Sequence, residues 1–512
     1  MKQLVSVPIN APCVRGLNLQ QSSTVLGGEW ASVATNCVFD GFGRLASRRG
    51  WAALNSSSIT YDIDQVHEHI GLAATEIISA ANLKLYKGTA TLTDITGTVT
   101  TPTANNWKFL NFYGNTLGFQ SGHGPIVWSG TGNFADITRS YPSSGTETWG
   151  DPALAAFGRV WTTTANGKVI KYSALLDETS WTDDTGANGD GSADAGIVDM
   201  STVWPAGMDT VTALAEFDNY LVIFGKRSVV MYSGADDPST MSKADAIAGI
   251  GCIARDSVQN VGTDLLYLSY NGIESLKRTV IQNKNPLTNV SRYIRDDLVL
   301  SIGAETLADI RSTYNEKEGL YILVFPSLDI CYVLDTKFKG QDPEYRITTW
   351  NSITPTSLTT ASDGTLYLGQ TGYLGKYDTY LDDAATYLME VQTGWIDLGD
   401  ISADIGSIEK ILKRILVTIY TGKNNTIITT WSYDFEDAES SSSKTITSTE
   451  AAEYNIAEYS VDEYGGGASL HVLKNMVQGA GRVFKIGVRA NINTSIVALH
   501  KITTQFKPGK QI

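Results

Sequence analysis

The chain has 512 residues, of which 54 are Asp or Glu and 39 are Lys or Arg, so its formal net charge is −15. This acidic balance argues against tight binding of nucleic acid, which needs Lys and Arg gathered on one face to neutralise phosphates. Apolar stretches fall far short of the roughly 18 residues of a membrane span, and early prolines interrupt any secretion signal. The 48 glycines, 24 tyrosines and 11 tryptophans favour an all-β fold rich in tight turns.

The first 58 residues read as an N-terminal arm. Within residues 26–54, a polar strand, a Gly-containing turn and a second strand lead to an Arg-Arg-Gly-Trp sequence. The arm is expected either to supply a strand that closes a ring of sheets or to contact a neighbouring subunit. Arg44, Arg48, Arg49 and Trp51 are its interface candidates. Given the acidity of the chain, an interface role suits the three arginines better than DNA contact, and a solvated strand end is the simplest alternative.

Residues 59–388 contain seven β-hairpin signals in succession, each with β-branched and aromatic strands flanking a turn of Gly, Asn or Asp. The hairpins close at Tyr86, Trp128, Tyr172, Tyr232, Leu276, Leu334 and Tyr377. Four of the six intervals between these positions are 42–44 residues long, which matches the length of about 40–45 residues of a four-stranded propeller blade. We therefore predict a β-propeller of six to seven blades. Its closing aromatic residues should pack between blades rather than form a ladder for stacking ligands.

The two longer intervals contain insertions, at residues 177–210 and 279–316. The first is rich in Gly and Asp without hydrophobic periodicity, which predicts a long exposed acidic loop. The second has apolar residues every three to four positions, which predicts a helix. These residues are Val290, Tyr293, Ile294, Leu298 and Ile302, with Asn289 as the candidate N-cap.

Residues 389–512 do not repeat the blade pattern and predict a C-terminal β-sandwich-like domain. The clearest strand signal lies in residues 482–490, where apolar and basic residues alternate. The apolar face is Phe484, Ile486, Val488 and Ala490, and the other face carries Lys485 and Arg489. Residues 411–420, 426–435 and 495–506 are further predicted strands. The polar, Ser-rich residues 436–453 predict a flexible loop or an edge excursion.

Metal and cofactor signals are weak, and we predict neither a metal site nor a cofactor. His67 and His69 would lie on one face of a strand, but no third ligand is evident nearby. The acidic run at residues 190–194 lacks the alternating ligand spacing and terminal Glu of a calcium loop. The four cysteines are far apart and are expected to be buried, reduced thiols. They are Cys13, Cys37, Cys252 and Cys331.

Catalytic signals are equally weak, and no catalytic residue is predicted. Neither a nucleophile elbow nor a Walker loop occurs between a strand and a helix. Glycosidases need paired carboxylates, but carboxylates are so frequent here that their presence discriminates nothing. The repeated turn of sialidase propellers is absent, and residues 362–365 are only an ordinary turn. We expect a protein that is not an enzyme.

Five segments, taken in order and spacing, resemble a known family. They are residues 43–51, 158–181, 217–234, 318–335 followed by Trp350, and 484–506. Together they are similar to the tail nozzle, or tail hub, proteins of short-tailed bacteriophages, also called packaged-DNA stabilisation proteins, over nearly the whole chain. The resemblance implies a structural virion protein, made in the host cytoplasm. Six copies would form a ring below the portal and adaptor rings, retain the packaged DNA and serve as the conduit for its ejection.

The same resemblance implies the partners of the chain. These are a head-to-tail adaptor ring, a tail needle or plug, fibres or spikes, and a transient contact with the host envelope. DNA would pass through the lumen without specific binding, because carboxylates on the wall repel phosphate at short range, with screening beyond about 8–10 Å. One alternative is a tail-tip propeller that binds a receptor or glycan. Another is an intracellular propeller scaffold, which would be a stable monomer.

Overall fold

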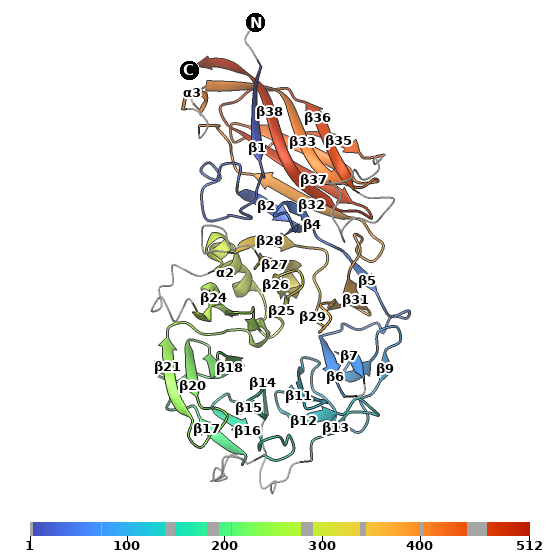
Figure 1. The fold of residues 1–512 in the computed structure, drawn as a ribbon, viewed down its shortest axis with the longest axis vertical. Helices are drawn as coiled ribbons and strands as arrows, with labels where there is room; N and C mark the ends of the chain where they lie inside the picture. The colour runs from blue at the N-terminus through green and yellow to red at the C-terminus, as the bar shows by residue number, and fades with distance from the viewer. Residues whose placement is uncertain are drawn as a thin grey trace.

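Seven antiparallel sheets follow one another along the chain and lie around one axis, as Figure 1 shows. The computed structural model describes residues 4–72, 74–138, 149–181, 194–205, 207–277, 290–337, 345–399, 403–406, 408–447 and 468–511. The first strand of each sheet contacts the start of the next sheet, and the seventh sheet contacts the first. The described residues therefore form a closed β-propeller of seven blades, which confirms the predicted fold class.

Blades one to three have four strands each, in sequence order. Blade one comprises β6 (Gln65–Ile70), β7 (Thr75–Ala81), β8 (Lys84–Lys87) and β9 (Thr93–Asp94). Blade two comprises β10 (Lys108–Phe112), β11 (Asn115–Gln120), β12 (His123–Trp128) and β13 (Ala135–Asp136). Blade three comprises β14 (Trp149–Ala156), β15 (Arg159–Thr164), β16 (Val169–Tyr172) and β17 (Gly196–Asp199).

Blades four to seven continue the ring with two variations. Blade four comprises β18 (Val211–Phe217), β19 (Tyr220–Gly225), β20 (Ser228–Ser233) and β21 (Ser242–Ala248). Blade five follows the short 3-10 helix η1 (Arg255–Ser257) and has three described strands, β22 (Gln259–Asn260), β23 (Leu265–Ser269) and β24 (Gly272–Ser275). Blade six comprises β25 (Arg311–Asn315), β26 (Leu320–Phe325), η4 (Pro326–Leu328), β27 (Ile330–Asp335) and β28 (Arg346–Trp350). Blade seven comprises β29 (Ser357–Thr360), β30 (Leu366–Gly369), β31 (Leu374–Tyr377) and β5 (Trp51–Ala53).

The outer strand of blade seven comes from the N-terminal arm. β5 pairs antiparallel with β31, so that Trp51 lies opposite Tyr377. The Trp51 indole covers Gly375, where a Cβ would come within 2.6 Å of the ring. The arm is expected either to close the ring of sheets or to contact a neighbouring subunit. The pairing of β5 with β31 shows that it closes the ring. The propeller is held shut by hydrogen bonds between residues more than 300 positions apart.

The seven predicted hairpins correspond to the second and third strands of the seven blades. Their closing residues lie at or next to the end of the third strand in each blade. Trp128, Tyr172, Tyr232 and Tyr377 are buried, and the Tyr377 ring stacks on Trp350 with centroids 5.4 Å apart. Packing between blades, as predicted, is the role of these aromatic residues.

A helical segment covers blade five beside its third strand. The 3-10 turn η3 (Arg292–Ile294) leads into α2 (Arg295–Ala304), and the five predicted apolar residues are all buried. The Val290 amide donates a hydrogen bond to the Ile273 carbonyl on β24, and the Ser291 hydroxyl accepts one from the Ile273 amide. The segment therefore supplies hydrogen-bond partners for the backbone of Ile273. The predicted helix is confirmed, but it begins without a side-chain cap; Asn289 lies outside the described residues.

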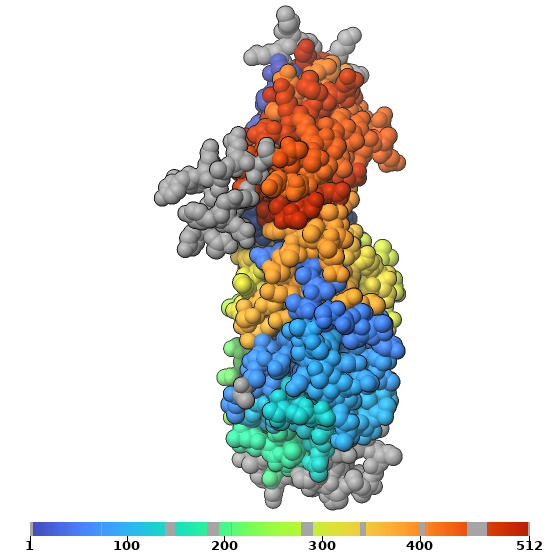
Figure 2. Space-filling model, turned by 90° about the vertical axis from the view of Figure 1, so that its right-hand side faces the viewer, coloured from blue at the N-terminus to red at the C-terminus, as the bar shows by residue number. Residues whose placement is uncertain are grey.

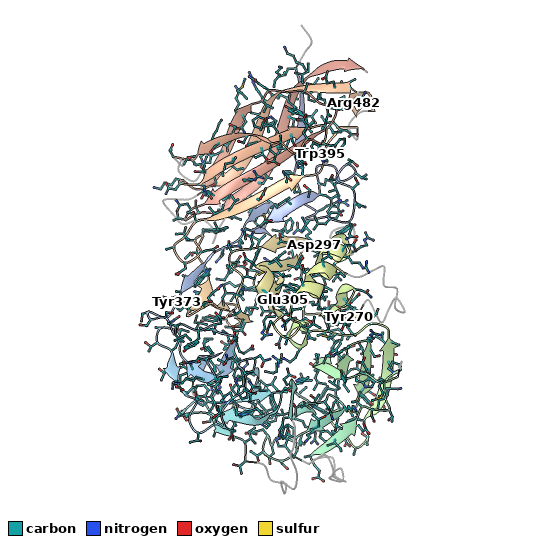
Figure 3. All side chains as sticks on the ribbon, turned by 180° about the vertical axis from the view of Figure 1, so that it is seen from behind. Tyr270, Asp297, Glu305, Tyr373, Trp395 and Arg482 are labelled. Carbon is teal, nitrogen blue, oxygen red and sulfur yellow. The ribbon has the colours of Figure 1, made fainter. Side chains whose placement is uncertain are left out.

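Side chains at both ends of α2 tie blade six to this helix; Figure 3 labels the two acidic ones, Asp297 and Glu305. The Tyr332 hydroxyl on β27 donates to Asp297, with an oxygen–oxygen distance of 2.6 Å. Glu305, just beyond the helix, accepts from the Ser327 amide at 2.9 Å. The insertion therefore fastens blade five to blade six. No helix in the described part of the chain has the length and apolar character needed to cross a membrane.

Glu274 on β24 supplies a testable pH dependence. Its side chain is 4% exposed, and burial raises its pKa from 4.5 to about 7. The folded protein thus holds a proton that the unfolded chain has released, so stability should fall as the pH rises from about 4.5 through about 7. Relative to Glu274→Gln, the wild type should lose about 3 kcal/mol between pH 4.5 and pH 8. Urea unfolding at both pH values measures this difference, and parallel stability profiles would contradict it.

The predicted exposed loop at residues 177–210 is wrong in part. Residues 196–199 form β17, the outer strand of blade three. Trp181, Met200 and Trp204 are buried, and the last two belong to the core between blades three and four. Isolated apolar residues in Gly- and Asp-rich sequence lack periodicity, so the pattern gave no sign of their burial. Residues 182–193 of the predicted loop lie outside the described residues.

The C-terminal domain has two packed sheets. One contains β3 (Cys37–Phe39), β4 (Leu45–Ser47), β38 (Val497–Gln511), β33 (Ile408–Thr421) and β36 (Ser469–Met476), with β1 (Val5–Asn10) also pairing β38. The other contains β2 (Ala31–Thr35), β32 (Tyr387–Thr393), β37 (Phe484–Ile492), β34 (Thr426–Tyr433) and β35 (Ser440–Thr445). A four-residue helix, α3 (Ala403–Gly406), precedes β33. This confirms the β-sandwich-like prediction. β35 is an edge strand within the Ser-rich segment, which fits the edge excursion rather than the loop.

The two domains share one sheet and one core. β2 pairs with β28 of blade six on one side and with β32 on the other, which makes a continuous nine-stranded sheet. One hydrophobic cluster runs from the sandwich through blades five and six to α2. Figure 2 shows the resulting elongated molecule, with the C-terminal domain beyond one edge of the propeller. Bending between the domains would break the β2–β28 pairing and contacts in the shared core, so both features oppose it.

Candidate functional site at the propeller axis

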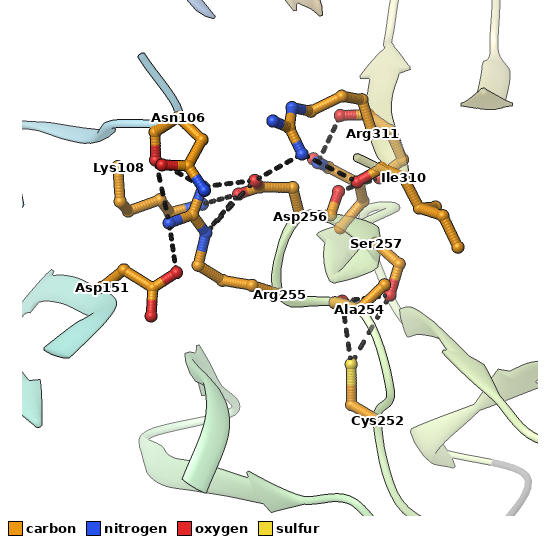
Figure 4. A network of polar contacts seen from close by, with 12 residues as sticks. Asn106, Lys108, Asp151, Cys252, Ala254, Arg255, Asp256, Ser257, Ile310 and Arg311 are labelled. Atoms are coloured by element: carbon orange, nitrogen blue, oxygen red, sulfur yellow. Dashed lines mark hydrogen bonds and ion pairs between the residues drawn. The ribbon is translucent and has the colours of Figure 1, made fainter. Parts of the chain in front are cut away.

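Charged side chains from four blades converge on the propeller axis (Figure 4). Lys108 lies on β10, Asp151 on β14 and Arg311 on β25, each the first strand of its blade, while Arg255 and Asp256 form η1 before blade five. First strands contact each other around the ring, so alternate side chains on them face the axis. This placement explains why residues separated by up to about 200 positions meet.

Asp256 is the centre of this network. Its carboxylate lies 2.6 Å from an Arg255 Nη, 3.3 Å from Lys108 Nζ and 3.6 Å from Arg311 Nη1. Arg255 also pairs with Asp151 at 2.8 Å. Burial alone would raise the pKa of Asp256, but the cations of Arg255, Lys108 and Arg311 outweigh it and hold the pKa far below its usual range. The axis is therefore crossed by ion pairs that lock blades two, three, five and six together.

A polar cavity of about 520 Å³ lies beside this network. Its wall is formed by segments that precede first strands and by turns between second and third strands, which meet on one face of the propeller. The main lining groups are Asp62, Asp64, Asn105, Asn106, Asp309 and Arg311. Three carboxylates against one guanidinium, with amides between them, suit a hydroxylated or cationic small ligand rather than an anion.

Two of these lining groups are perturbed by burial. Burial raises the pKa of Asp64, although a hydrogen bond from the Asn105 amide at 2.9 Å opposes this shift. Arg311 is 5% exposed, and burial lowers its pKa more than Asp256 raises it. Its Nε has no hydrogen-bond partner in the described part of the chain. Buried donors are normally satisfied; this atom is so enclosed that it does not itself face a ligand in the cavity.

The structure separates the four interface candidates of the arm. Arg48 is fully buried and makes two hydrogen bonds to Asp382, at 2.7 and 2.8 Å, with its guanidinium over the Tyr387 ring. Arg44 pairs with Asp40 at 2.7 Å and lies over Tyr420. In this conformation, neither side chain is available as a free cation to an outside partner.

The other two candidates are more accessible. Arg49 is about half-exposed and lies 3.6 Å from Glu318 and 3.8 Å from Asp378. Trp51 is partly buried in the last blade, where it closes the ring. The three arginines that are close in sequence thus have three different environments. Only Arg49 presents its guanidinium at the surface.

The remaining predicted groups are internal or outside the described residues. His67 hydrogen-bonds to Asn111 at 3.2 Å and His69 to Thr116 at 2.8 Å, so both histidines connect blades one and two. Of residues 190–194 only Asp194 is described, and its carbonyl accepts from Arg159. All four cysteines are buried, as predicted. No cluster of three metal-ligating side chains occurs among the described residues.

Sequence reasoning missed the axial network. One signal was present: Lys108 stands between the apolar residues Trp107 and Phe109, and Arg255 is adjacent to Asp256 just before a strand. A charge in a buried strand implies an opposite charge nearby. The sequence does not say which of the 54 acidic residues supplies it.

Comparisons with known proteins add no family. No family model matches the sequence, and no curated protein matches it. Among solved structures, the Pan2 WD40 domain of Neurospora crassa is similar at 9% identity and a TM-score of 0.38, with 65% of this chain and 96% of that one covered. The extracellular domain of a one-component system from B. thetaiotaomicron is similar at 10% identity and a TM-score of 0.28, covering 71% and 43%. Likeness this low carries no argument, so the fold rests on the strand pairing described above.

Proposed function

We propose that the chain is a structural subunit of a short phage tail, where a six-fold ring retains packaged DNA and conducts it during ejection. This proposal rests on the resemblance of the five sequence segments to tail nozzle proteins. It also makes the chain a protein of the virion and not an enzyme. The adaptor ring, the plug, the fibres and the host envelope enter the proposal as its partners.

The observation that carries the proposal is the union of the two domains through one sheet and one core. A tail subunit must hold its position while pressurised DNA passes, so a hinge between its domains would be a weakness. Here a continuous nine-stranded sheet and a shared core join the domains, and ion pairs lock the propeller across its axis. Because side chains cross that axis, the conduit would run between subunits, along the axis of the ring.

Electrostatics supplies the second part of the mechanism. The net charge of −15 per subunit becomes sixfold larger in the ring. Carboxylates on a lumen wall repel phosphates within the Debye length of about 8–10 Å, so DNA would be guided without being retained by specific contacts. Basic side chains on the wall would instead add affinity for the phosphates and slow the passage.

The solution mass of the purified chain tests this proposal. Mass photometry and negative-stain microscopy should show six copies in a ring with an open channel, either for the chain alone or after addition of the adaptor ring. A chain that stays monomeric in both cases would overturn the proposed function. The cavity on the propeller face would then be the site to test for ligand binding.

The cavity favours a second function, the binding of a receptor glycan at the tail tip. Carboxylates and amides in a polar cavity are the groups that fix sugar hydroxyls. Asp309 is exposed on its wall and its carboxylate makes no described hydrogen bond. If glycans bind here, Asp309→Asn should weaken binding to an array of bacterial surface oligosaccharides about tenfold while leaving the melting temperature unchanged. Equal binding by both proteins would exclude the cavity.

A further inference from the structure

The open face of one C-terminal sheet differs in charge from the rest of the molecule. Strands β1, β38, β33 and β36 lie side by side (Figure 1) and hold seven Lys or Arg residues but one acidic residue, Glu409. One of the seven, Lys410, is buried and does not belong to the open face. The remaining chain holds 32 basic and 53 acidic residues. This face is therefore basic while the rest of the protein is acidic. Surfaces of opposite charge attract each other and direct how proteins associate.

Strand register shows which side chains share the open face. Val7, Ile502, Val417 and Leu473 point into the core, so their neighbours along each strand point outward. One outward row joins Lys501, Thr418 and Val472, and the next joins Thr503, Leu416 and Lys474. A third row joins Gln505, Arg414 and Met476, and Lys507 lies opposite Ile411 beyond it.

The cations of this face have no counterions in the described residues. None of Lys474, Lys501, Lys507 and Arg414 takes part in an ion pair there, whereas most other buried or half-buried arginines of the chain do. Glu409 stands at the end of β33 against Gly509, away from the rows that carry Lys474 and Lys501. The face therefore presents positive charge to whatever approaches it.

Apolar side chains lie between these cations. Val472 is 62% exposed, Met476 66% and Leu470 42%, all on the edge strand β36. Aliphatic groups interleaved with lysines suit a protein surface, where burying them gives binding energy. Single-stranded nucleic acid would instead be expected to meet exposed aromatic rings, and the rows described above carry no Phe, Tyr or Trp.

We propose that this face docks on the acidic surface of a neighbouring copy of the chain, and so forms a subunit contact in the ring proposed above, on which the inference rests. The chain carries the complementary charge on its other surfaces. Two copies of the basic face cannot pair with each other, because four cations would oppose four. The contact is therefore heterologous, and a heterologous contact repeated around an axis closes into a ring or continues as a filament.

Charge reversal tests the contact in the full chain. Lys474→Glu with Lys501→Glu should weaken assembly about 100-fold or more, measured as the subunit concentration at which rings appear in mass photometry. Both side chains are at least partly exposed and have no described ion pair, so the melting temperature should not change. The matched control is Lys168→Glu with Lys243→Glu, which makes the same charge change on exposed propeller positions and should leave assembly intact.

Other outcomes separate this inference from the proposed function. If the wild type forms rings and the double reversal on the face does so equally, the inference is wrong and the ring stands. A wild type that never forms rings overturns both. If the reversal instead abolishes binding to a double-stranded DNA probe without affecting rings, the face is a nucleic-acid surface and the inference fails. Independently of any variant, assembly through this face should weaken as salt rises, and rings that are insensitive to salt would contradict it.

Discussion

Replacing Arg48 with Met should destabilise the protein by about 3–5 kcal/mol, because it leaves a buried carboxylate without its counterion. The Arg48 side chain is fully buried, and its guanidinium hydrogen-bonds to both oxygens of Asp382 and to Asn36 at 2.9 Å. It also donates to the backbone carbonyls of Arg49 and Asn351. These contacts join the arm, blade six and the segment after blade seven at the point where the ring closes. Urea unfolding followed by tryptophan fluorescence measures the loss.

The neighbouring arginine is the matched control for this prediction. Arg49 is about half-exposed, and its ion-pair distances are 3.6 and 3.8 Å, so Arg49→Met should cost less than about 1 kcal/mol. Adding Asp382→Asn to Arg48→Met should recover part of the lost stability, since the unpaired charge is then gone. Equal losses for the two single arginine variants would show that the buried pair does not hold the ring closed.

Sequence could predict the propeller because its signal is local. Each hairpin lies within about 20 residues, and the aromatic residue that closes it recurs with the blade. The outer strand of blade seven could not be predicted in this way. Its partner β31 lies more than 300 residues away, and the short strand at Trp51 has no repeat to mark its place. The sequence of the arm was therefore compatible both with ring closure and with a contact to another subunit.

The arginine cluster shows the same limit for the candidate site. Arg48 and Arg49 are adjacent and look equivalent in the sequence, yet one is buried and the other half-exposed. The difference arises from Asp382, which lies 334 positions from Arg48. A charged residue in a buried segment indicates that an oppositely charged partner is needed. Which residue is that partner depends on how the blades pack together. The same reason hid Asp256, whose three cations come from three places in the ring.

Replacing Asp256 with Asn should be the most damaging single change at the propeller axis, with an expected cost of about 3–5 kcal/mol. The variant leaves Arg255, Lys108 and Arg311 close together, and among the described ion pairs of these three cations only the one between Arg255 and Asp151 remains. Asp256 is 8% exposed, so water screens these cations poorly. The matched control is Asp245→Asn, which removes the same charge from an exposed position on β21 and should change stability by no more than about 0.5 kcal/mol.

The pH dependence of this difference identifies its cause. The folded-state pKa of Asp256 lies far below the value of about 3.9 expected in the unfolded chain. A depressed pKa contributes stability that is fully present above the unfolded value and is lost as the pH falls below it. The gap between wild type and Asp256→Asn should therefore be constant from pH 8 to about pH 5 and shrink below about pH 4. A gap that stays unchanged in acid would mean that Asp256 acts through packing, and that the ion pairs do not lock the blades.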